Sequence, residues 1–312
     1  MAHKPVLSVV IPVFNEEESV DILVERLRRV LDDLTIRSEV VFVNDGSRDR
    51  TAQKLGAARA KDSRIRVLNL SRNFGHQCAI SAGLDRAAGE VCVIMDGDAQ
   101  DPPELIPKLL AQWKEGFEVV HAVRKERQGE TFFKRWTAYG FYRILRMVTD
   151  VPISKDAGDF RLMDKKVVQA LRAVHERSRF LRGLVTWVGF HQTEVYFVRE
   201  SRKAGKTKFS LPRMWRFAKD AITSFSVVPL QMATSLGMLF SGAAFLYSLD
   251  VLYDHFVTGR TVAGWTSLMI VVLYFGGIQM MFLGVLGEYI GRIFEEVKQR
   301  PLYVIDSEEG FD

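Results

Sequence analysis

The sequence has few cysteines and none of the common nucleotide-binding fingerprints. Cys78 and Cys92 are the two cysteines among 312 residues, and their spacing fits neither a metal site nor a redox pair, so both are expected to be inert core thiols. No G-x-G-x-x-G follows the first apolar run, and no G-x-x-x-x-G-K-S/T occurs. These absences argue against a dinucleotide-dependent enzyme and against a P-loop nucleotidase.

Charge is missing from two long stretches, residues 221–249 and 261–287. Each exceeds the roughly 20 apolar residues that a bilayer crossing needs. Soluble helices rarely run so long without a charged face, so two buried core helices are the less favoured alternative. The pattern predicts a membrane protein with a two-helix transmembrane hairpin over 229–290.

Lys and Arg gather on both sides of this hairpin and avoid its connecting loop. Eight lie between 199 and 219, three lie between 292 and 300, and the loop "DVLYDHFVTGR" holds only Arg260. Because cytoplasmic flanks carry the positive charge, both ends are predicted in the cytoplasm and the loop outside. No cleavage site follows the N-terminal apolar run. We therefore expect a multi-pass protein of the cell (inner) membrane, with its N-terminal part on the cytoplasmic face.

The first ~125 residues alternate short apolar runs with helical patterns, which is typical of an α/β fold. Strands are expected at 6–14, 39–45, 66–71, 90–96 and 118–123, and helices at 18–34, 51–62 and 76–89. Continuous apolar strands predict a Rossmann-like, mostly parallel sheet with helices on both faces. Such sheets bind ligands beyond the carboxyl ends of their strands. Three polar clusters fall there: "NEEES", "NDGSRD" and the acids of "MDGDAQDPPE".

The last of these clusters crowds four acids at one strand end. Asp101, two prolines and Glu104 have the form of a helix start, so these two acids are expected to be structural. Asp96 and Asp98 flank one residue, with Gln100 nearby. Carboxylate and amide oxygens suit Mg²⁺ or Mn²⁺ and leave positions open for substrate phosphates. An Asp-x-Asp alone is a weak motif, because turns use Asp freely.

Two other features each allow two interpretations. Asp45 in "VNDGS" fits a tight turn, and it equally fits a carboxylate that accepts hydrogen bonds from a base or ribose. The loop "RKAGKTKF" fits a polybasic anchor for anionic lipid. It also fits a phosphate clamp with Arg202 and Lys208 as the cations. The two interpretations of the loop are compatible.

Two segments mix aromatic with basic residues, and the chain ends in acids. Residues 132–150 form either a membrane-surface helix or a packed one, whereas 211–225 favour the interfacial helix. The final "DSEEGFD" is expected to be a frayed acidic tail. The predicted organisation is therefore a cytosolic α/β domain at 1–210, an interfacial amphipathic helix at 211–228, the hairpin at 229–290 and a cytosolic tail at 291–312.

Eight motifs together resemble those of a known family. They are "VVIPVFNEEES", "VNDGSRDRT", "SRNFGHQCAISAGLDRAAGE", "MDGDAQDPPE", "GDFRLMD", "ERSRFLRGL", "RKAGKTKF" and "VLGEYIGRIFEEVKQRP". The chain resembles the polyprenyl-phosphate glycosyltransferases of the inverting, metal-dependent GT-A class over nearly its whole length. It is most similar to the bactoprenol (undecaprenyl-phosphate) glucosyltransferases and less similar to the dolichol-phosphate mannose synthases.

The resemblance implies a nucleotide-sugar donor, a polyprenyl-phosphate acceptor and a set of site residues. Implied for the nucleotide pocket are Pro12, Asn15, Glu16, Asp45 and Asp96; for the metal, Asp96, Asp98 and Gln100; and for catalysis, Asp98, Asp159, Arg202 and Lys208. Gly97 stands where Ala or Val is common, which is expected only to loosen the loop. The implied partners are the bilayer, a homotetramer and a small membrane flippase, with no nucleic acid.

The implied reaction moves a sugar, with inversion, from the donor to the lipid phosphate. Glucose from UDP-glucose is favoured by likeness, while mannose and an amino sugar stay open. The acceptor is a phosphate monoester whose second pKa is near ~6, so it is mostly a dianion at neutral pH and needs no general base. Asp159 is therefore predicted to orient the sugar or a cation such as Arg161 or Arg202.

Two rival functions remain open at this point. A processive polysaccharide synthase would need more membrane helices and a Q-x-x-R-W motif, but Phe132 stands where that motif before Arg135-Trp136 needs Gln. A nucleotide-sensing membrane scaffold without enzymatic activity is the second rival. Transfer assays with labelled nucleotide sugars separate it from an enzyme.

Overall fold

A computed structural model describes residues 5–124, 157–177, 179–197, 228–253, 256–257 and 264–311. These residues form two compact units. The first contains the described residues up to 197 together with 300–311, and the second contains those from 228 to 299. Arg202, Lys208 and the segments 132–150 and 211–225 lie outside the described residues.

The first unit is built on one eight-stranded sheet with the order β7-β5-β6-β4-β1-β2-β3-β8. Its strands are β1 Leu7–Val13, β2 Ser38–Asn44, β3 Ile65–Leu70, β4 Val91–Ile94, β5 Val119–Arg124, β6 Ala157–Asp164, β7 Gln192–Phe197 and β8 Ile305–Glu309. Among the described strands, only β6 and β8 run against the others, because β6 pairs antiparallel with β4 and β5 and β8 pairs antiparallel with β3. The mostly parallel α/β sheet predicted from the sequence is therefore confirmed.

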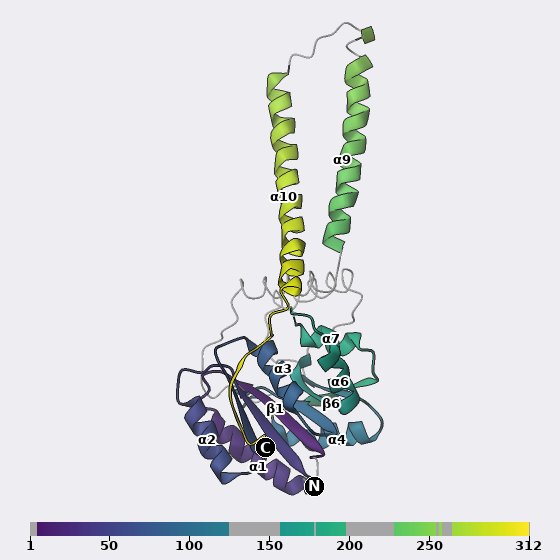
Figure 1. Cartoon of the computed structure of the whole chain (residues 1–312). Coiled ribbons are helices and arrows are strands. Elements are labelled where there is room, and N and C mark those ends of the chain that lie inside the picture. Colours follow the sequence, from purple (N-terminus) through teal and green to yellow (C-terminus); the bar gives the residue numbers. More distant parts are fainter. Residues whose placement is uncertain are drawn as a thin grey trace, which may run out of the picture. The chain divides into compact units, whose positions relative to one another are not determined.

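Helices cover both faces of this sheet (Figure 1). The helices of the unit are α1 Val20–Leu34, α2 Thr51–Lys61, α3 His76–Arg86, the short η1 Pro103–Leu105, α4 Ile106–Lys114, α6 Lys165–Ala173 and α7 Leu181–Trp187. Side chains of α1, α2 and α4 share a core with Val9 and Phe42. On the other face, Gly83 of α3 lies against Val10 and Val43. All seven residues of β1 are buried, as expected for an inner parallel strand.

The C-terminal residues do not fray. β8 pairs antiparallel with β3, and Ser71 donates its backbone N–H to the carbonyl of Val304 at 3.0 Å. Figure 1 shows this yellow segment lying along the sheet. The prediction of a frayed tail is wrong, because acidic side chains stay exposed on an edge strand while the backbone groups pair with β3.

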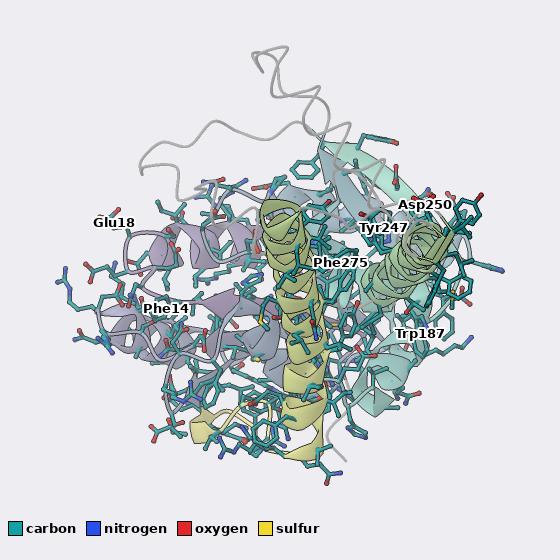
Figure 2. All side chains as sticks on the ribbon, turned by 90° about the horizontal axis from the view of Figure 1, so that it is seen from above. Phe14, Glu18, Trp187, Tyr247, Asp250 and Phe275 are labelled. Atoms are coloured by element: carbon teal, nitrogen blue, oxygen red, sulfur yellow. The ribbon has the colours of Figure 1, made fainter. Side chains whose placement is uncertain are left out.

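The second unit consists of two long helices, α9 Val228–Tyr253 and α10 Trp265–Val297. Phe240 of α9 packs edge-to-face against Phe275 of α10 at a centroid distance of 5.8 Å. Figure 2 labels Tyr247 and Asp250 on α9 and Phe275 on α10. Within the described residues, no helix combines the length and the apolar character that a membrane crossing requires.

Candidate active site

The loops after β1 and β2 are hydrogen-bonded to each other at the carboxyl edge of the sheet. Asn15 donates its backbone N–H to the Ser47 hydroxyl at 3.0 Å and accepts the N–H of Arg48 on Oδ1 at 2.9 Å. Glu16 donates its N–H to the Thr51 hydroxyl at 2.9 Å. Asn15 takes the left-handed conformation with φ +54°, which Asn tolerates better than most residues. These contacts join "NEEES" and "NDGSRD" into one surface.

Asp45, at the end of β2, holds the loop that follows β3. Its buried carboxylate accepts the N–H of Phe74 at 2.7 Å, the N–H of Gly75 at 3.0 Å and the Asn73 amide at 2.9 Å. Burial raises the pKa of Asp45 above its ordinary value, although the two backbone N–H groups act in the opposite direction. We call the three loops 14–19, 44–51 and 72–75 the donor-side loops.

Pro12, another residue implied for the nucleotide pocket, lies buried in β1 beside Val43 of β2. Because β1 ends at Val13, Pro12 lies next to the loop 14–19. The neighbouring Gly46 has φ +68°, and a Cβ there would come within 2.5 Å of the Arg72 backbone carbon. A glycine is therefore required where the loop after β2 packs against the loop after β3.

The acidic turn 96–101 follows β4. Asp98 accepts the N–H of Gln100 on Oδ1 at 3.1 Å, and both side chains are partly exposed. Asp101 is almost fully buried and accepts the N–H of Asp96 at 3.3 Å. Asp101 is thus structural, but it does not cap the following helix as expected: η1 has no side-chain cap and begins after Pro102. Asp101 braces the acidic turn instead.

Two more residues fix the shape of the acidic turn. Glu104 forms an ion pair with Arg26 at 2.7 Å, and Arg26 also donates to the carbonyl of Ala99 at 3.2 Å. At Gly97, an added Cβ would lie 2.6 Å from a Val13 methyl and 2.8 Å from the Pro12 carbonyl oxygen. The expectation that Gly97 merely loosens the loop is wrong, because the glycine is what lets the turn pack against β1.

Asp159 of β6 lies at the centre of a cluster of cations. Arg182 of α7 binds its carboxylate with two nitrogens, Nε to Oδ1 at 3.0 Å and Nη2 to Oδ2 at 3.2 Å. The Nε2 atom of His76 lies 3.2 Å from Oδ2, and a guanidinium nitrogen of Arg161 lies 3.5 Å from Oδ1. We call His76, Arg161 and Arg182 with Asp159 the cation cluster.

Gln77 joins the two helices that supply this cluster. Its amide nitrogen lies 3.4 Å from Asp159 Oδ2, and its amide oxygen accepts the N–H of Leu181 at 3.1 Å. The start of α3 and the start of α7 are thus both tied to one carboxylate. Asp159 therefore fixes the side chain of Arg182, and Gln77 fixes the backbone of the preceding residue, Leu181.

Asp159 and the cations around it stabilise each other's charged forms. Burial alone would raise the pKa of Asp159, but the His76 hydrogen bond and the charges of Arg182 and Arg161 hold it well below its ordinary value. Burial alone would lower the pKa of His76, but Asp159 and Asp96 raise it. Asp159 is therefore an ion at any physiological pH and a weak base.

The Arg161 guanidinium is buried next to the His121 ring of β5, since these residues face each other across the β5–β6 pair. Burial lowers the pKa of Arg161 to about 10. Burial and the Arg161 charge lower the pKa of His121 to about 4, although its ring nitrogen lies 2.8 Å from the Gln192 amide oxygen. His121 is thus uncharged at neutral pH and lies beside the ion pair of Arg161 and Asp159.

The structure brings the cation cluster and the acidic turn together through His76. Its Nε2 atom lies 3.5 Å from Asp96 Oδ1, and one ligand atom each of His76, Asp96 and Asp159 lie within 4.8 Å of one another. Asp159 already binds two guanidinium groups, which disfavours a second role as a metal ligand. The partly exposed Asp96 and Asp98, with Gln100, offer the oxygen atoms that suit Mg²⁺ or Mn²⁺.

Sequence reasoning missed His76, Gln77 and Arg182 as site residues. His76 and Gln77 follow the loop after β3, at the same sheet edge as the predicted clusters, and this position was a usable signal. Arg182 belongs to "ERSRFLRGL", a motif that carried the family resemblance, but no ligand role was assigned to it there. It lies 23 positions from Asp159 in the sequence. Only the fold brings it to Asp159.

Comparison with known proteins identifies the family. Residues 8–172 match the model of glycosyl transferase family 2. The chain is 49% identical to the uncharacterized glycosyltransferase YkcC of Bacillus subtilis over 98% of its length and 94% of that protein. It is 40% identical to a prophage bactoprenol glucosyl transferase homolog of Escherichia coli over 96% of its length and 98% of that protein. It is equally similar to the bactoprenol glucosyl transferase of Shigella phage SfII, over 96% and 97%.

Two solved synthase structures are similar to part of this chain. Mannosyl-3-phosphoglycerate synthase of Rubrobacter xylanophilus is 16% identical, with a TM-score of 0.48 over 70% of this chain and 72% of that one. Glucosyl-3-phosphoglycerate synthase of Mycobacterium tuberculosis, solved with Mn²⁺, uridine diphosphate and glucosyl-3-phosphoglycerate, is 18% identical, with a TM-score of 0.45 over 70% of this chain and 78% of that one. The family match and the full-length relatives show that the chain belongs to glycosyl transferase family 2 and is a glycosyltransferase.

Proposed function

We propose that this enzyme transfers a hexose from a nucleotide sugar to the phosphate of a polyprenyl phosphate, with inversion at the anomeric carbon. Glucose, UDP-glucose and undecaprenyl phosphate are the favoured sugar, donor and acceptor, because relatives named bactoprenol glucosyl transferases match nearly the whole chain. The observation that carries the proposal is the cation cluster beside the acidic turn. It places fixed positive charge next to a metal-binding motif, as transfer between two phosphate-bearing substrates requires.

We assign the metal to Asp96, Asp98 and Gln100 of the acidic turn. Their partly exposed oxygen atoms fit Mg²⁺ or Mn²⁺, and Asp101 and Arg26 keep the turn in one shape. A bound ion would neutralise the donor diphosphate and make the nucleoside diphosphate a better leaving group.

The donor-side loops are assigned to the nucleoside of the donor. Asn15 and Glu16 lie on the first loop, above the buried Pro12. Asp45 was open to two interpretations, and its carboxylate accepts three hydrogen bonds from residues 73–75. We therefore assign to Asp45 the shaping of the nucleoside pocket.

Asp159 is assigned to orientation and not to proton abstraction. Its low pKa makes it a weak base, and the lipid phosphate is already a dianion near neutral pH. By binding Arg182 with both oxygens, Asp159 fixes a cation in place before the reaction begins. Arg182 and His76 are then available to attract substrate phosphate while the phosphate oxygen attacks the anomeric carbon.

Arg202 and Lys208 are assigned to the acceptor phosphate. Both come from a basic loop ahead of the first charge-free stretch, where a lipid phosphate at the bilayer surface is within reach. Lys208→Ala should raise the KM for the lipid more than the KM for the nucleotide sugar, when each is measured separately. An effect confined to the donor KM contradicts the clamp.

Membrane attachment through the hairpin is also a proposal. Leu239 and Phe245 of α9 and Met280 and Ile293 of α10 are exposed. The charge-free stretches also extend beyond the described residues, at 221–227 and 261–263. Single cysteines placed in the loop 250–260 should be labelled in whole cells by an impermeant reagent. Labelling that needs permeabilised cells contradicts the orientation.

The decisive experiment is a donor panel with the purified full-length enzyme, undecaprenyl phosphate and Mg²⁺ or Mn²⁺. UDP-glucose, GDP-mannose and UDP-N-acetylglucosamine are tested in parallel, and the products are analysed by mass. One hexose per lipid supports the proposal, and the preferred donor decides between glucose, mannose and an amino sugar. Long saccharide chains would indicate a processive synthase. If no donor supports transfer, the alternative of a nucleotide-sensing scaffold without enzymatic activity is favoured. Native mass determination in the same preparation tests the homotetramer and a co-purifying flippase.

A further inference from the structure

Contacts from residues 303–309 reach the strand and the helix that lead into the site. β8 pairs with β3, whose end continues into the donor-side loop 72–75. The Tyr303 hydroxyl donates to Asp85 of α3 at 2.7 Å, and Glu308 forms an ion pair with Arg86 of the same helix. Because α3 begins at His76, the C-terminal segment braces both elements that enter the site.

A continuous chain of hydrogen bonds runs from this segment to the first donor-side loop. Asn69 of β3 donates to the Ser307 hydroxyl at 3.0 Å, and Asn44 of β2 donates to Asn69 Oδ1 at 2.9 Å. Ser47 donates its N–H to Asn44 Oδ1 at 3.1 Å. Asn15, finally, donates its N–H to the Ser47 hydroxyl at 3.0 Å. We call Ser307, Asn69, Asn44, Ser47 and Asn15 the polar relay.

The geometry of this relay leaves few alternatives for its members. Asn44 is 4% exposed, so its amide has little access to water that could replace Asn69. The amide nitrogen of Asn44 donates to Asn69, toward the C-terminal segment, and its amide oxygen accepts the N–H of Ser47. A change at Asn69 therefore has to alter how Asn44 holds Ser47 and, through it, Asn15.

We propose that the C-terminal segment positions the nucleotide pocket through the polar relay, with Ser307 and Asn69 as positioning residues for the nucleotide donor. The proposal rests on the donor-side assignment of Asn15 made above. By reciprocity, a nucleotide that orders Asn15 and Ser47 must also stabilise the pairing of β8 with β3.

The test measures nucleotide affinity in the full-length enzyme, apart from sugar transfer. Calorimetry with UDP, GDP and ADP in the presence of Mn²⁺ gives the Kd for the wild type, Ser307→Ala and Asn69→Ala. We expect the Kd of the preferred nucleotide to rise ~3-fold for Ser307→Ala, whose hydrogen bond is exposed, and ~10-fold for Asn69→Ala, which leaves the buried Asn44 amide without its partner. Ser307→Thr keeps the hydroxyl and should restore the wild-type Kd.

Ser38→Ala is the matched control. It removes a serine hydroxyl from β2, at the opposite end of the strand from Asn44, and among the described residues that hydroxyl has no hydrogen-bond partner. Its Kd should equal that of the wild type. Hydrogen exchange supplies a second readout: the amides of 305–309 should exchange more slowly with the preferred nucleotide bound in the wild type, and this protection should shrink in Asn69→Ala.

The outcomes separate this inference from the proposed function. If Asn69→Ala lowers the melting temperature but leaves the Kd unchanged, the relay only stabilises the fold and the inference is wrong. If no nucleoside diphosphate binds the wild type, the donor-side assignment fails and the inference falls with it. If the wild type binds a nucleotide and the relay variants weaken that binding, but no sugar reaches the lipid, the inference stands and the proposed function is wrong.

Discussion

The donor-side loops and the cation cluster lie at the same sheet edge but are built differently. Asp45 is held by two backbone N–H groups and one amide, and burial raises its pKa. Asp159 is held by guanidinium and imidazole groups, and these lower its pKa. One buried aspartate thus shapes backbone through hydrogen bonds, while the other balances several positive charges.

This difference indicates a division of labour between the two regions. Hydrogen bonds from a fixed backbone can recognise the shape of an uncharged group such as a nucleoside. Fixed cations attract phosphate and act over a longer distance. Substitutions in the two regions should therefore affect different kinetic constants.

The largest effect is expected at Asp98 of the acidic turn. Asp98→Asn keeps the shape of the side chain but removes a charged metal ligand, so kcat should fall by ~100- to 1,000-fold. Asp101→Asn is the matched control and should be mild, because an amide oxygen can still accept the Asp96 N–H. Transfer assays of both variants give the comparison. A larger loss for Asp101→Asn would contradict our assignment of the acids.

Asp159→Asn should lower kcat by ~100-fold, because Arg182 and the buried Arg161 lose their counter-charge. Since the pKa of Asp159 already lies below its ordinary value, it does not titrate near neutral pH. The acidic limb of the rate profile should therefore stay near pH ~6, where the acceptor phosphate ionises. Disappearance of that limb in the variant would identify Asp159 as a base. Asp164→Asn, on the same strand, is the control.

Asp45→Asn should act on the donor alone. An amide offers one acceptor oxygen where the carboxylate offers two, so a donor among residues 73–75 is left without its partner. We expect the KM for the nucleotide sugar to rise by ~10-fold, with the KM for the lipid unchanged. Asp62→Asn, in the loop between α2 and β3, is the control. Equal changes in both constants would remove the distinction between the two regions.

The smallest expected effect is a loss of folding stability at acid pH that is caused by protonation of His121. Its pKa of about 4 in the folded protein lies below the ordinary 6.5, so between these values the unfolded chain binds a proton that the folded chain does not. Stability should therefore fall as the pH drops from 6.5 to 4, by up to ~1.4 kcal/mol per pH unit. Melting temperatures of His121→Gln should decline less steeply. His191→Gln, at a side chain that is 85% exposed, should follow the wild type.

Much of the fold could be predicted from the sequence because its signals are local. Continuous apolar strands and amphipathic helices located β1 to β5 and α1 to α3 within a few residues of their observed bounds. The turn at Asp96 and Asp98 and the loop at Asn15 follow predicted strands, and so their place at the sheet edge could be inferred. The family was confirmed for the same reason, since its motifs are short and contiguous.

What could not be predicted depends on contacts between distant residues. Asp159 meets Arg182 across 23 positions and His76 across 83, and no local pattern records either contact. Asn69 meets Ser307 across 238 positions. The acidic composition of 306–312 predicted a solvated tail, whereas the backbone of Ile305–Glu309 pairs with β3. Composition reports on side chains, and edge pairing is a property of the main chain.

The pairing of β8 with β3 also affects how readily this enzyme aggregates. Without β8, the outermost strand on that side would be β3, whose sequence "IRVLNL" is apolar and offers unpaired backbone groups to any other chain. With β8 in place, the outermost strand is "IDSEE", whose exposed Asp306 and Glu308 repel a second acidic edge. Charged edge strands are a common protection against edge-to-edge aggregation. We therefore expect versions truncated before β8 to precipitate more readily than the full-length chain.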